Sequence, residues 1–222
     1  MNKKFIEFLV RNEVLRFGDF TTKSGRKTPY FINMGMINSG KSSYELGVFF
    51  AQKISKILGD DFDTVYGPAY KGIPLAVSVS IGLYRKLKLE RSWLFDRKEV
   101  KEHGDKSAFV GDGPREGQRL VMVDDVMTTG GTKEEAIAKL KAAANVQLKG
   151  IFIGVDREEK GKEKNAIKEF EELTGVKVHA IEKASSIFKY LHNREINGKV
   201  HVNDEIFAAF KEYQKQYGAR YV

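Results

Sequence analysis

The chain has 222 residues, of which 41% are hydrophobic and 31% charged, so it has enough apolar material for a core and is neither disordered nor fibrous. The absence of cysteine excludes a disulfide scaffold, thiolate catalysis and cysteine-ligated zinc, and it fits a cytoplasmic protein. A formal net charge of +8 predicts an anionic ligand of some kind.

The N-terminal segment predicts an amphipathic helix, because Glu7 and Arg11 interrupt its apolar residues and no signal-peptide cleavage site follows. No run approaches the roughly 18 apolar residues of a membrane span, so none is expected. The four histidines, at positions 103, 179, 192 and 201, lack metal-ligand spacing. Without an internal repeat or a linker-like segment, residues 1–222 are expected to form a single domain.

Alternating strand-like and helix-like segments predict an α/β fold. Short β-branched or aromatic runs indicate strands at residues 30–33, 64–66, 120–123, 151–155 and 176–181. Helical periodicity indicates helices at 43–58, 73–86, 132–144 and 164–173, and a last helix at 203–217 that either packs on the domain or joins a subunit contact. The alternation predicts a mainly parallel sheet flanked by helices, with the uniformly apolar run 150–155 as a central strand buried on both faces.

The strongest chemical signal follows the strand at 120–123. Two adjacent acids, Asp124 and Asp125, precede a loop of small residues that leads into a helix. The glycines of the loop let backbone amides converge, its threonines add hydroxyl donors, and the helix contributes its positive end, so the loop is predicted to cradle a monophosphate. The residues of this loop are Thr128, Thr129, Gly130, Gly131 and Thr132.

The two acids narrow the choice of ligand. Carboxylates beside a phosphate cradle repel the phosphate unless they face hydroxyl groups or a magnesium ion, and a ribose 5-phosphate meets that condition. Lys133 follows Thr132, the reverse of the Walker order, which disfavours nucleoside triphosphate hydrolysis. The alternative is a strand that ends in solvated acids, with Thr128 or Thr129 capping the helix.

Two further loops carry cations at the same expected edge of the sheet. Tyr70 and Lys71 lie in a tight turn before a helix with proline in its first turn, which predicts a second anion pocket. Residues 97–106 are highly charged, which predicts a mobile lid. The alternatives are an ordinary strand-to-helix turn and a solvated loop. The candidate residues of the lid are Arg97, Lys98, Lys101 and His103.

The last candidates are Lys23, Phe31 and Arg157. Arg157 follows the strand at 151–155, where its guanidinium is predicted to hold a carboxylate through two parallel hydrogen bonds, and Phe31 offers a stacking face. The alternatives are a surface pair of Asp156 with Arg157 and a place for Phe31 in the core.

These segments resemble a known family. Residues 121–132 resemble the phosphoribosyl-diphosphate (PRPP) binding motif of type I phosphoribosyltransferases. Segments 22–27, 67–74 and 97–104 look like signature segments of the orotate phosphoribosyltransferase family, and the resemblance spans about residues 15–160. It implies the type I phosphoribosyltransferase fold, with an N-terminal helix and small hood over about 1–40, a core over about 41–185 and C-terminal helices over about 186–222.

The resemblance also implies a reaction, in which orotate and PRPP give orotidine 5′-monophosphate and diphosphate in pyrimidine (UMP) biosynthesis. It implies Mg²⁺ as cofactor, carried by PRPP with at most a water-bridged contact to Asp124 or Asp125, and a homodimer in which one subunit's lid completes the neighbouring site.

The family implies three groups of site residues. PRPP is expected to contact Tyr70, Lys71, Asp124, Asp125, Thr128, Thr129, Gly130, Gly131 and Thr132, and orotate is expected to contact Lys23, Phe31, Thr128 and Arg157. Catalysis through an oxocarbenium-like state is expected to depend on Lys71, Arg97, Lys98, Lys101, His103, Asp124 and Asp125, which stabilise the departing diphosphate or the positive ring.

Two other functions stay open: a transferase for a purine or uracil, and a non-catalytic regulator that senses PRPP and binds RNA or DNA. Lys23 and Arg157 favour an acidic base over a purine or uracil. The positive charge is spread along the chain without a nucleic-acid motif, so neither nucleic acid nor membrane is an expected partner.

Overall fold

The structure is a computed structural model that describes residues 1–21, 25–98, 108–127 and 130–219. Its centre is a six-stranded sheet in the order β5-β4-β3-β6-β7-β8, in which the β4–β5 pair is antiparallel and the other pairs are parallel. The predicted α/β class with a mainly parallel sheet is therefore confirmed. The strands are β3 (Thr64–Tyr66), β4 (Ser92–Asp96), β5 (Phe109–Gly111), β6 (Arg119–Val126), β7 (Gln147–Asp156) and β8 (Val178–Lys183).

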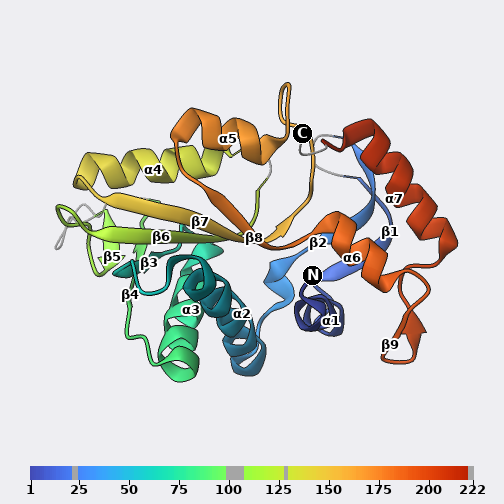
Figure 1. The fold of residues 1–222 in the computed structure, drawn as a ribbon, viewed down its shortest axis with the longest axis horizontal. Helices are drawn as coiled ribbons and strands as arrows, with labels where there is room; N and C mark the ends of the chain where they lie inside the picture. The colour runs from blue at the N-terminus through green and yellow to red at the C-terminus, as the bar shows by residue number, and fades with distance from the viewer. Residues whose placement is uncertain (22–24, 99–107, 128–129, 220–222) are drawn as a thin grey trace.

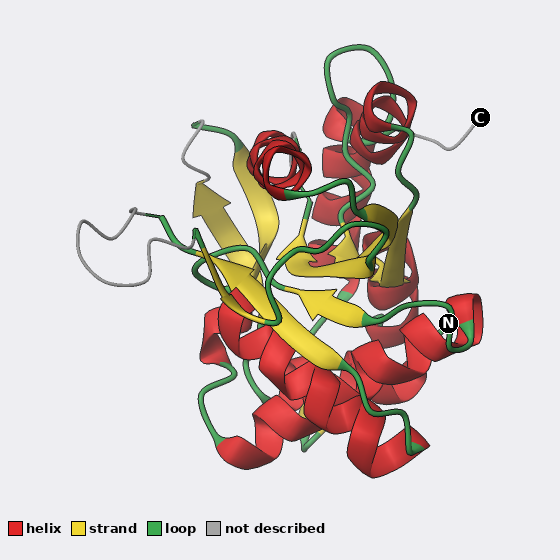
Figure 2. Cartoon of the chain, turned by 90° about the vertical axis from the view of Figure 1, so that its left-hand side faces the viewer, coloured by secondary structure: helices red, strands yellow, loops and turns green. Residues whose placement is uncertain are grey.

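Helices cover both faces of this sheet (Figure 1). Helices α2 (Gly40–Leu58) and α3 (Gly72–Leu87) lie on one face, and α4 (Gly131–Ala143) and α5 (Ala166–Thr174) lie on the other. The side view in Figure 2 shows the sheet between these layers. Helices α2 and α3 pack so closely that a Cβ atom at Gly47 would lie only 2.0 Å from the carbonyl oxygen of Ser78. Glycine at position 47 makes this close approach possible.

Alternate residues of β6 face the two layers. Leu120 and Met122 belong to the core under α4 and α5, Val121 and Val123 belong to the core on the other face, and all four are fully buried. The apolar part of β7 is buried in the same way, as predicted. However, β7 lies second from the edge and not at the centre, because β8 forms the edge on one side of it and the other four strands lie on its other side.

The N-terminal strands form a two-stranded sheet of their own. Strands β1 (Leu15–Thr21) and β2 (Lys27–Ile32) pair with each other in an antiparallel hairpin, so the strand predicted at 30–33 exists but does not belong to the central sheet. The connection between them is too short for the crossover that a parallel pair requires. Before them, α1 (Lys3–Arg11) is the predicted amphipathic helix, and after them the short 3₁₀ helix η1 (Met34–Met36) leads toward α2.

The C-terminal segment packs against this hairpin. Helix α6 (Ala184–Leu191), the small hairpin β9 (Glu195–Ile196) and β10 (Lys199–Val200), and helix α7 (Asp204–Tyr217) complete the chain. Phe210 and Tyr213 of α7 are buried, with their rings 6.0 and 5.9 Å from the ring of Tyr30 on β2. Helix α7 therefore packs on the domain. Within the described ranges, no helix combines the length and apolar character of a bilayer span.

Candidate active site

The strand order brings four of the predicted loops to one edge of the sheet. Strands β4, β3, β6 and β7 are parallel neighbours, so the loops after all four leave from the same edge. These loops carry the predicted residues between 70 and 157, from Tyr70 to Arg157. Five predicted residues lie outside the described part of the chain: Lys23, Lys101, His103, Thr128 and Thr129.

Each of the two adjacent acids at the end of β6 has its own lysine. The Nζ atom of Lys133 lies 2.5 Å from Oδ2 of Asp124, and the Nζ atom of Lys71 lies 3.0 Å from Oδ2 of Asp125. The remaining oxygens accept backbone N–H groups, at 2.9 Å from Asp125 to Asp124 Oδ1 and at 2.7 Å from Val126 to Asp125 Oδ1. The ion pairs offset the repulsion between the two carboxylates and hold them in fixed orientations.

The two lysines differ in exposure. The side chain of Lys133 is 5% exposed and also donates a hydrogen bond of 2.9 Å to the carbonyl of Val126. The side chain of Lys71 is 62% exposed. Burial raises the pKa of Asp124 above its usual value, and the charge of Lys133 opposes that shift. Lys133 is thus a fixed counterion, whereas Lys71 is free to turn toward an anionic ligand.

Lys133 was not predicted as a site residue. Its order after Thr132 served only to exclude a Walker loop, and sequence periodicity does not show that its ammonium turns back to Asp124 and the carbonyl of Val126.

Helices α3 and α4 begin at this edge without side-chain caps. Their N-cap residues, Lys71 and Gly130, form no side-chain cap hydrogen bond, in contrast to Ser39 at the start of α2. Gly130 has φ +88°, and a Cβ atom there would lie 2.6 Å from Cδ2 of Phe170, so glycine is required. A Cβ at Gly131 would meet nothing within 4 Å, which leaves room beside the first amides of α4 for an anion.

A buried carboxylate holds the turn after β3 in place. Asp96 at the end of β4 accepts hydrogen bonds from the Ala69 amide at 2.9 Å, the Tyr66 hydroxyl at 3.1 Å and the Lys139 ammonium at 2.6 Å. Burial acts to raise the pKa of Asp96, but these hydrogen bonds outweigh it and the pKa lies below its usual value. Asp96 therefore ties the turn that carries Lys71 to the strand that leads into the predicted lid, a role that was not predicted from the sequence.

The described start of the predicted lid lies beside this turn. The amide of Arg97 donates a 2.7 Å hydrogen bond to the carbonyl of Ala108, which brings the two ends of the segment together. The Nζ atom of Lys98 lies 5.4 Å from the ring centroid of Tyr70, whose side chain is exposed. Lys98 and Lys71 thus both lie next to Tyr70.

The predicted base-binding residues lie toward the N-terminal hairpin. Phe31 on β2 is 42% exposed, with its ring 5.9 Å from that of Phe20, so it is not a core residue. Arg157 after β7 forms an ion pair with Glu159, with Nε and Oε1 2.8 Å apart, and its Cζ lies 5.1 Å from the Tyr30 ring. Glu159 was not singled out from the sequence, although it follows Arg157 by two residues.

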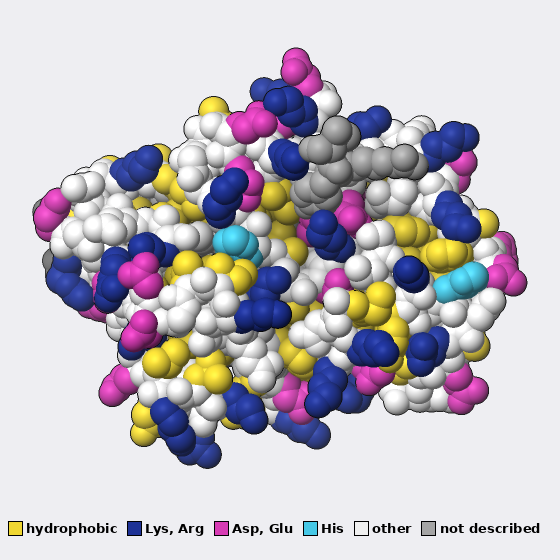
Figure 3. All heavy atoms as spheres, in the orientation of Figure 1, with side chains coloured by type: hydrophobic (Ala, Val, Ile, Leu, Met, Phe, Trp, Pro, Cys, Tyr) yellow, Lys and Arg dark blue, Asp and Glu magenta, His cyan; other side chains and the backbone are white. Residues whose placement is uncertain are grey.

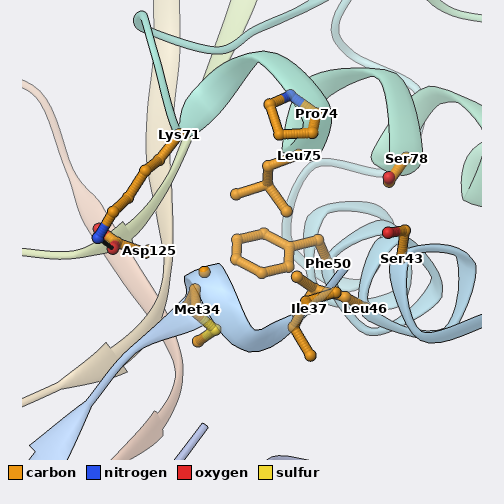
Figure 4. A pocket seen from close by; sticks show the side chains of 11 residues that line it. Met34, Ile37, Ser43, Leu46, Phe50, Lys71, Pro74, Leu75, Ser78 and Asp125 are labelled. Carbon is orange, nitrogen blue, oxygen red and sulfur yellow. Dashed lines mark hydrogen bonds and ion pairs between the residues drawn. The ribbon is translucent and has the colours of Figure 1, made fainter. Parts of the chain in front are cut away.

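A cavity of about 230 Å³ borders Asp125 (Figure 4). Lys71 and Asp125 form its polar rim, and its other walls are mainly apolar side chains from η1, α2 and α3, including Met34, Phe50 and Leu75. Such walls offer few donors to a phosphate, so the anion site is assigned to the loops and helix N-termini at the sheet edge. In the part of the chain that the structure describes, no three His, Asp or Glu side chains form a metal-binding cluster.

The Lys133–Asp124 pair gives a first prediction. Lys133→Met leaves a mostly buried carboxylate without its cation, and the free energy of unfolding is expected to fall by about 3–5 kcal/mol. Urea unfolding measures this change. The matched control is Lys141→Met, an exposed lysine of the same helix, which is expected to change stability by no more than about 0.5 kcal/mol. Equal stability of the two variants would show that the pair contributes nothing.

Comparison with known proteins agrees with this site. The family model of the phosphoribosyl transferase domain matches residues 34–182. The chain is 45% identical over 219 residues to the orotate phosphoribosyltransferase of Clostridium botulinum, with 98% of each chain covered. It is 45% identical over 227 residues to that of Bifidobacterium adolescentis, with 99% of this chain and 98% of the other covered.

A solved structure agrees with the family model and with these relatives. The crystal structure of orotate phosphoribosyltransferase from Francisella tularensis is similar with a TM-score of 0.83 and 36% identity, covering 98% of this chain and 97% of that one. The fold implied by the sequence resemblance, that of type I phosphoribosyltransferases, is therefore confirmed. This chain belongs to the orotate phosphoribosyltransferase family.

Proposed function

We propose that this protein transfers the 5-phosphoribosyl group from PRPP to orotate, giving orotidine 5′-monophosphate and diphosphate in pyrimidine biosynthesis. One observation carries the proposal: the lysine-paired acids of β6 lie at the same edge as the uncapped start of α4. Carboxylates that can accept hydrogen bonds from ribose hydroxyls lie next to an anion site, and this combination suits a ribose 5-phosphate.

The two ends of PRPP bind to different groups. The amides of Gly130, Gly131 and Thr132 hold the 5-phosphate, together with Thr128 and Thr129. Asp124 and Asp125 accept hydrogen bonds from the ribose hydroxyls and favour the positive charge that develops on the ring. Holding the sugar at both ends aligns its anomeric carbon with the incoming base.

The departing diphosphate is stabilised by cations from the turn after β3 and from the lid. Lys71 leaves Asp125 for the diphosphate, which its 62% exposed side chain allows. Arg97 and Lys98 stand at the start of the lid, and Lys101 and His103 follow them. Because charge builds up on the leaving group, these preorganised donors lower the barrier without a covalent nucleophile. Closure of the lid excludes water that competes for the same carbon.

Orotate lies between the hairpin and the sheet edge. Exposed Phe31 provides a stacking surface, Arg157 holds the base carboxylate, and Lys23 and Thr128 complete the contacts. A purine or uracil lacks the carboxylate that Arg157 binds, so the acidic base is favoured.

The donor set fits Mg²⁺ that arrives with PRPP. Asp124 and Asp125 are both already paired with lysines, and among the described residues no three His, Asp or Glu side chains form a metal-binding cluster. This suits an ion held mainly by the substrate's phosphates, with Asp124 or Asp125 binding through water. When bound, Mg²⁺ offsets charge on the diphosphate.

A regulator that binds nucleic acid is not favoured. On the face shown in Figure 3, Lys and Arg side chains alternate with Asp and Glu and form no continuous basic stripe. The cysteine-free sequence supports a cytoplasmic location for the enzyme.

The proposed reaction is tested by mixing the purified protein with PRPP, MgCl₂ and orotate. Loss of the free-base absorbance and release of one diphosphate per orotate are expected. Adenine, guanine and uracil in place of orotate are expected to give no comparable release of diphosphate, and a chelator is expected to stop the reaction with orotate. Faster turnover of another base would refute the proposed substrate.

The proposed homodimer is supported by exposed apolar side chains on the packed helices α2 and α3. Tyr44 on α2 and Ile81 and Tyr84 on α3 are 38, 48 and 55% exposed, so these two packed helices present large apolar groups to solvent. A second copy of the chain covers them and brings its lid to the neighbouring site.

Sedimentation is expected to give twice the 25.1 kDa mass of the chain. Tyr84→Glu is expected to produce monomers with little activity, because a charge replaces an apolar contact and the neighbour's lid is lost. Leu173→Glu on α5, where the native side chain is 71% exposed, is the control and is expected to remain dimeric and active. A fully active monomeric wild type would contradict the proposal.

A further inference from the structure

The loop after β7 is fixed by the C-terminal helix. The amide of Lys160 donates to the carbonyl of Tyr217 at 2.9 Å, the amide of Ala219 donates to the carbonyl of Glu158 at 2.8 Å, and Gln214 Nε2 donates to the carbonyl of Arg157 at 3.1 Å. A segment that follows a sheet strand is thus bound along its backbone to residues 57 to 61 positions away in the sequence.

The side chains continue this connection around Glu159. Its Oε1 atom accepts hydrogen bonds from Arg157 Nε at 2.8 Å and from the Tyr213 hydroxyl at 2.5 Å, and it lies 2.7 Å from Arg157 Nη2. The Arg157 and Glu159 side chains are 12 and 13% exposed, and Tyr213 is buried. Such burial makes a guanidinium costly to reorient once it is paired.

The charges of this cluster do not cancel. Arg26 lies 3.4 Å from Glu159 Oε2 through Nη1, and its Cζ stacks 4.5 Å from the Tyr217 ring. One carboxylate is therefore shared by two arginines, which leaves one positive charge in the trio of Arg26, Arg157 and Glu159. A substrate with a single carboxylate brings that trio to neutrality.

The contacts also define which nitrogen of the Arg157 guanidinium is available to a substrate carboxylate. Glu159 Oε1 contacts both Nε and Nη2 of the guanidinium, and Nη2 also lies 3.4 Å from the Tyr213 hydroxyl, so a substrate carboxylate is expected to bind at Nη1. A charge-assisted hydrogen bond from Nη1 is then the expected contact. Loss of Glu159 would allow the side chain to turn and would leave its charge unpaired.

We propose that Glu159 and Tyr213 are positioning residues for Arg157, through which helix α7 sets the affinity for the carboxylate of the base. This inference rests on the proposed function, in which Arg157 binds orotate. It gives the C-terminal helix a role in base recognition that its sequence, 54 residues from Glu159, does not indicate.

The test compares Glu159→Gln and Tyr213→Phe with the wild type. Glu159→Gln keeps the shape but not the charge, and it is expected to raise the KM for orotate about 10- to 100-fold. Tyr213→Phe removes one hydroxyl and is expected to raise the KM for orotate about two- to tenfold. The KM for PRPP and kcat are expected to stay within about twofold, since neither residue contacts the proposed PRPP groups. Tyr217→Phe on the same helix keeps the ring that stacks on Arg26 and is the control without an effect.

A double-mutant cycle with Arg157→Ala separates positioning from a general structural effect. Arg157→Ala alone is expected to raise the KM for orotate by at least about tenfold, and adding Glu159→Gln or Tyr213→Phe is expected to raise it no further. The inference would be overturned if Glu159→Gln or Tyr213→Phe changed the KM values for orotate and PRPP equally. It would also be overturned if either substitution still raised the KM for orotate in the Arg157→Ala background, or if Glu159→Gln bound orotate more tightly.

Failure of the proposed function gives a different result. If the wild type does not convert orotate, the function itself is wrong. If the wild type converts orotate and Arg157→Ala weakens it but Glu159→Gln and Tyr213→Phe do not, only the positioning inference fails. Thermal unfolding of each variant shows whether it is folded, and Tyr213→Phe still decides the question if Glu159→Gln does not fold.

Discussion

The site depends on how two adjacent carboxylates are held at the end of one strand. Asp124 and Asp125 follow the buried part of β6, where unpaired neighbouring charges would destabilise the fold. The buried Lys133 makes one pair permanent, and the exposed Lys71 makes the other pair exchangeable. A substrate can therefore replace the cation of Asp125 with its own hydroxyl groups and draw Lys71 to its phosphates, while Asp124 stays in place.

Two other acids, buried Asp96 and largely buried Glu159, hold residues of the neighbouring loops in the same way. Asp96 binds the amide of Ala69 and so fixes the turn before Lys71, and Glu159 binds the guanidinium of Arg157. In each case a carboxylate that does not itself face the proposed substrate holds a residue that does. The parallel strands supply the common edge, and these acids fix the orientation of the groups at that edge.

Much of the fold and the candidate site was accessible from the sequence. The uniformly apolar segments of β6 and β7 predict strands buried on both faces, and acids, glycines and a helix after β6 predict an anion site. The strand position of β7 and the separate β1–β2 hairpin were not accessible, because strand order depends on where later segments add to the sheet. Lys133, Asp96, Glu159 and Tyr213 were missed for a related reason: each acts through a contact that the tertiary fold creates, and for Tyr213 that contact spans 54 residues.

A crystal structure with PRPP and Mg²⁺ bound tests the exchange of cations most directly. The account predicts ribose hydroxyls within hydrogen-bond distance of Asp124 and Asp125, the 5-phosphate at the amides of Gly130 and Gly131, and Lys71 moved from Asp125 to the diphosphate while Lys133 keeps its 2.5 Å contact with Asp124. A sugar phosphate bound away from the two acids, or a Lys71 that stays on Asp125 with diphosphate present, would contradict it.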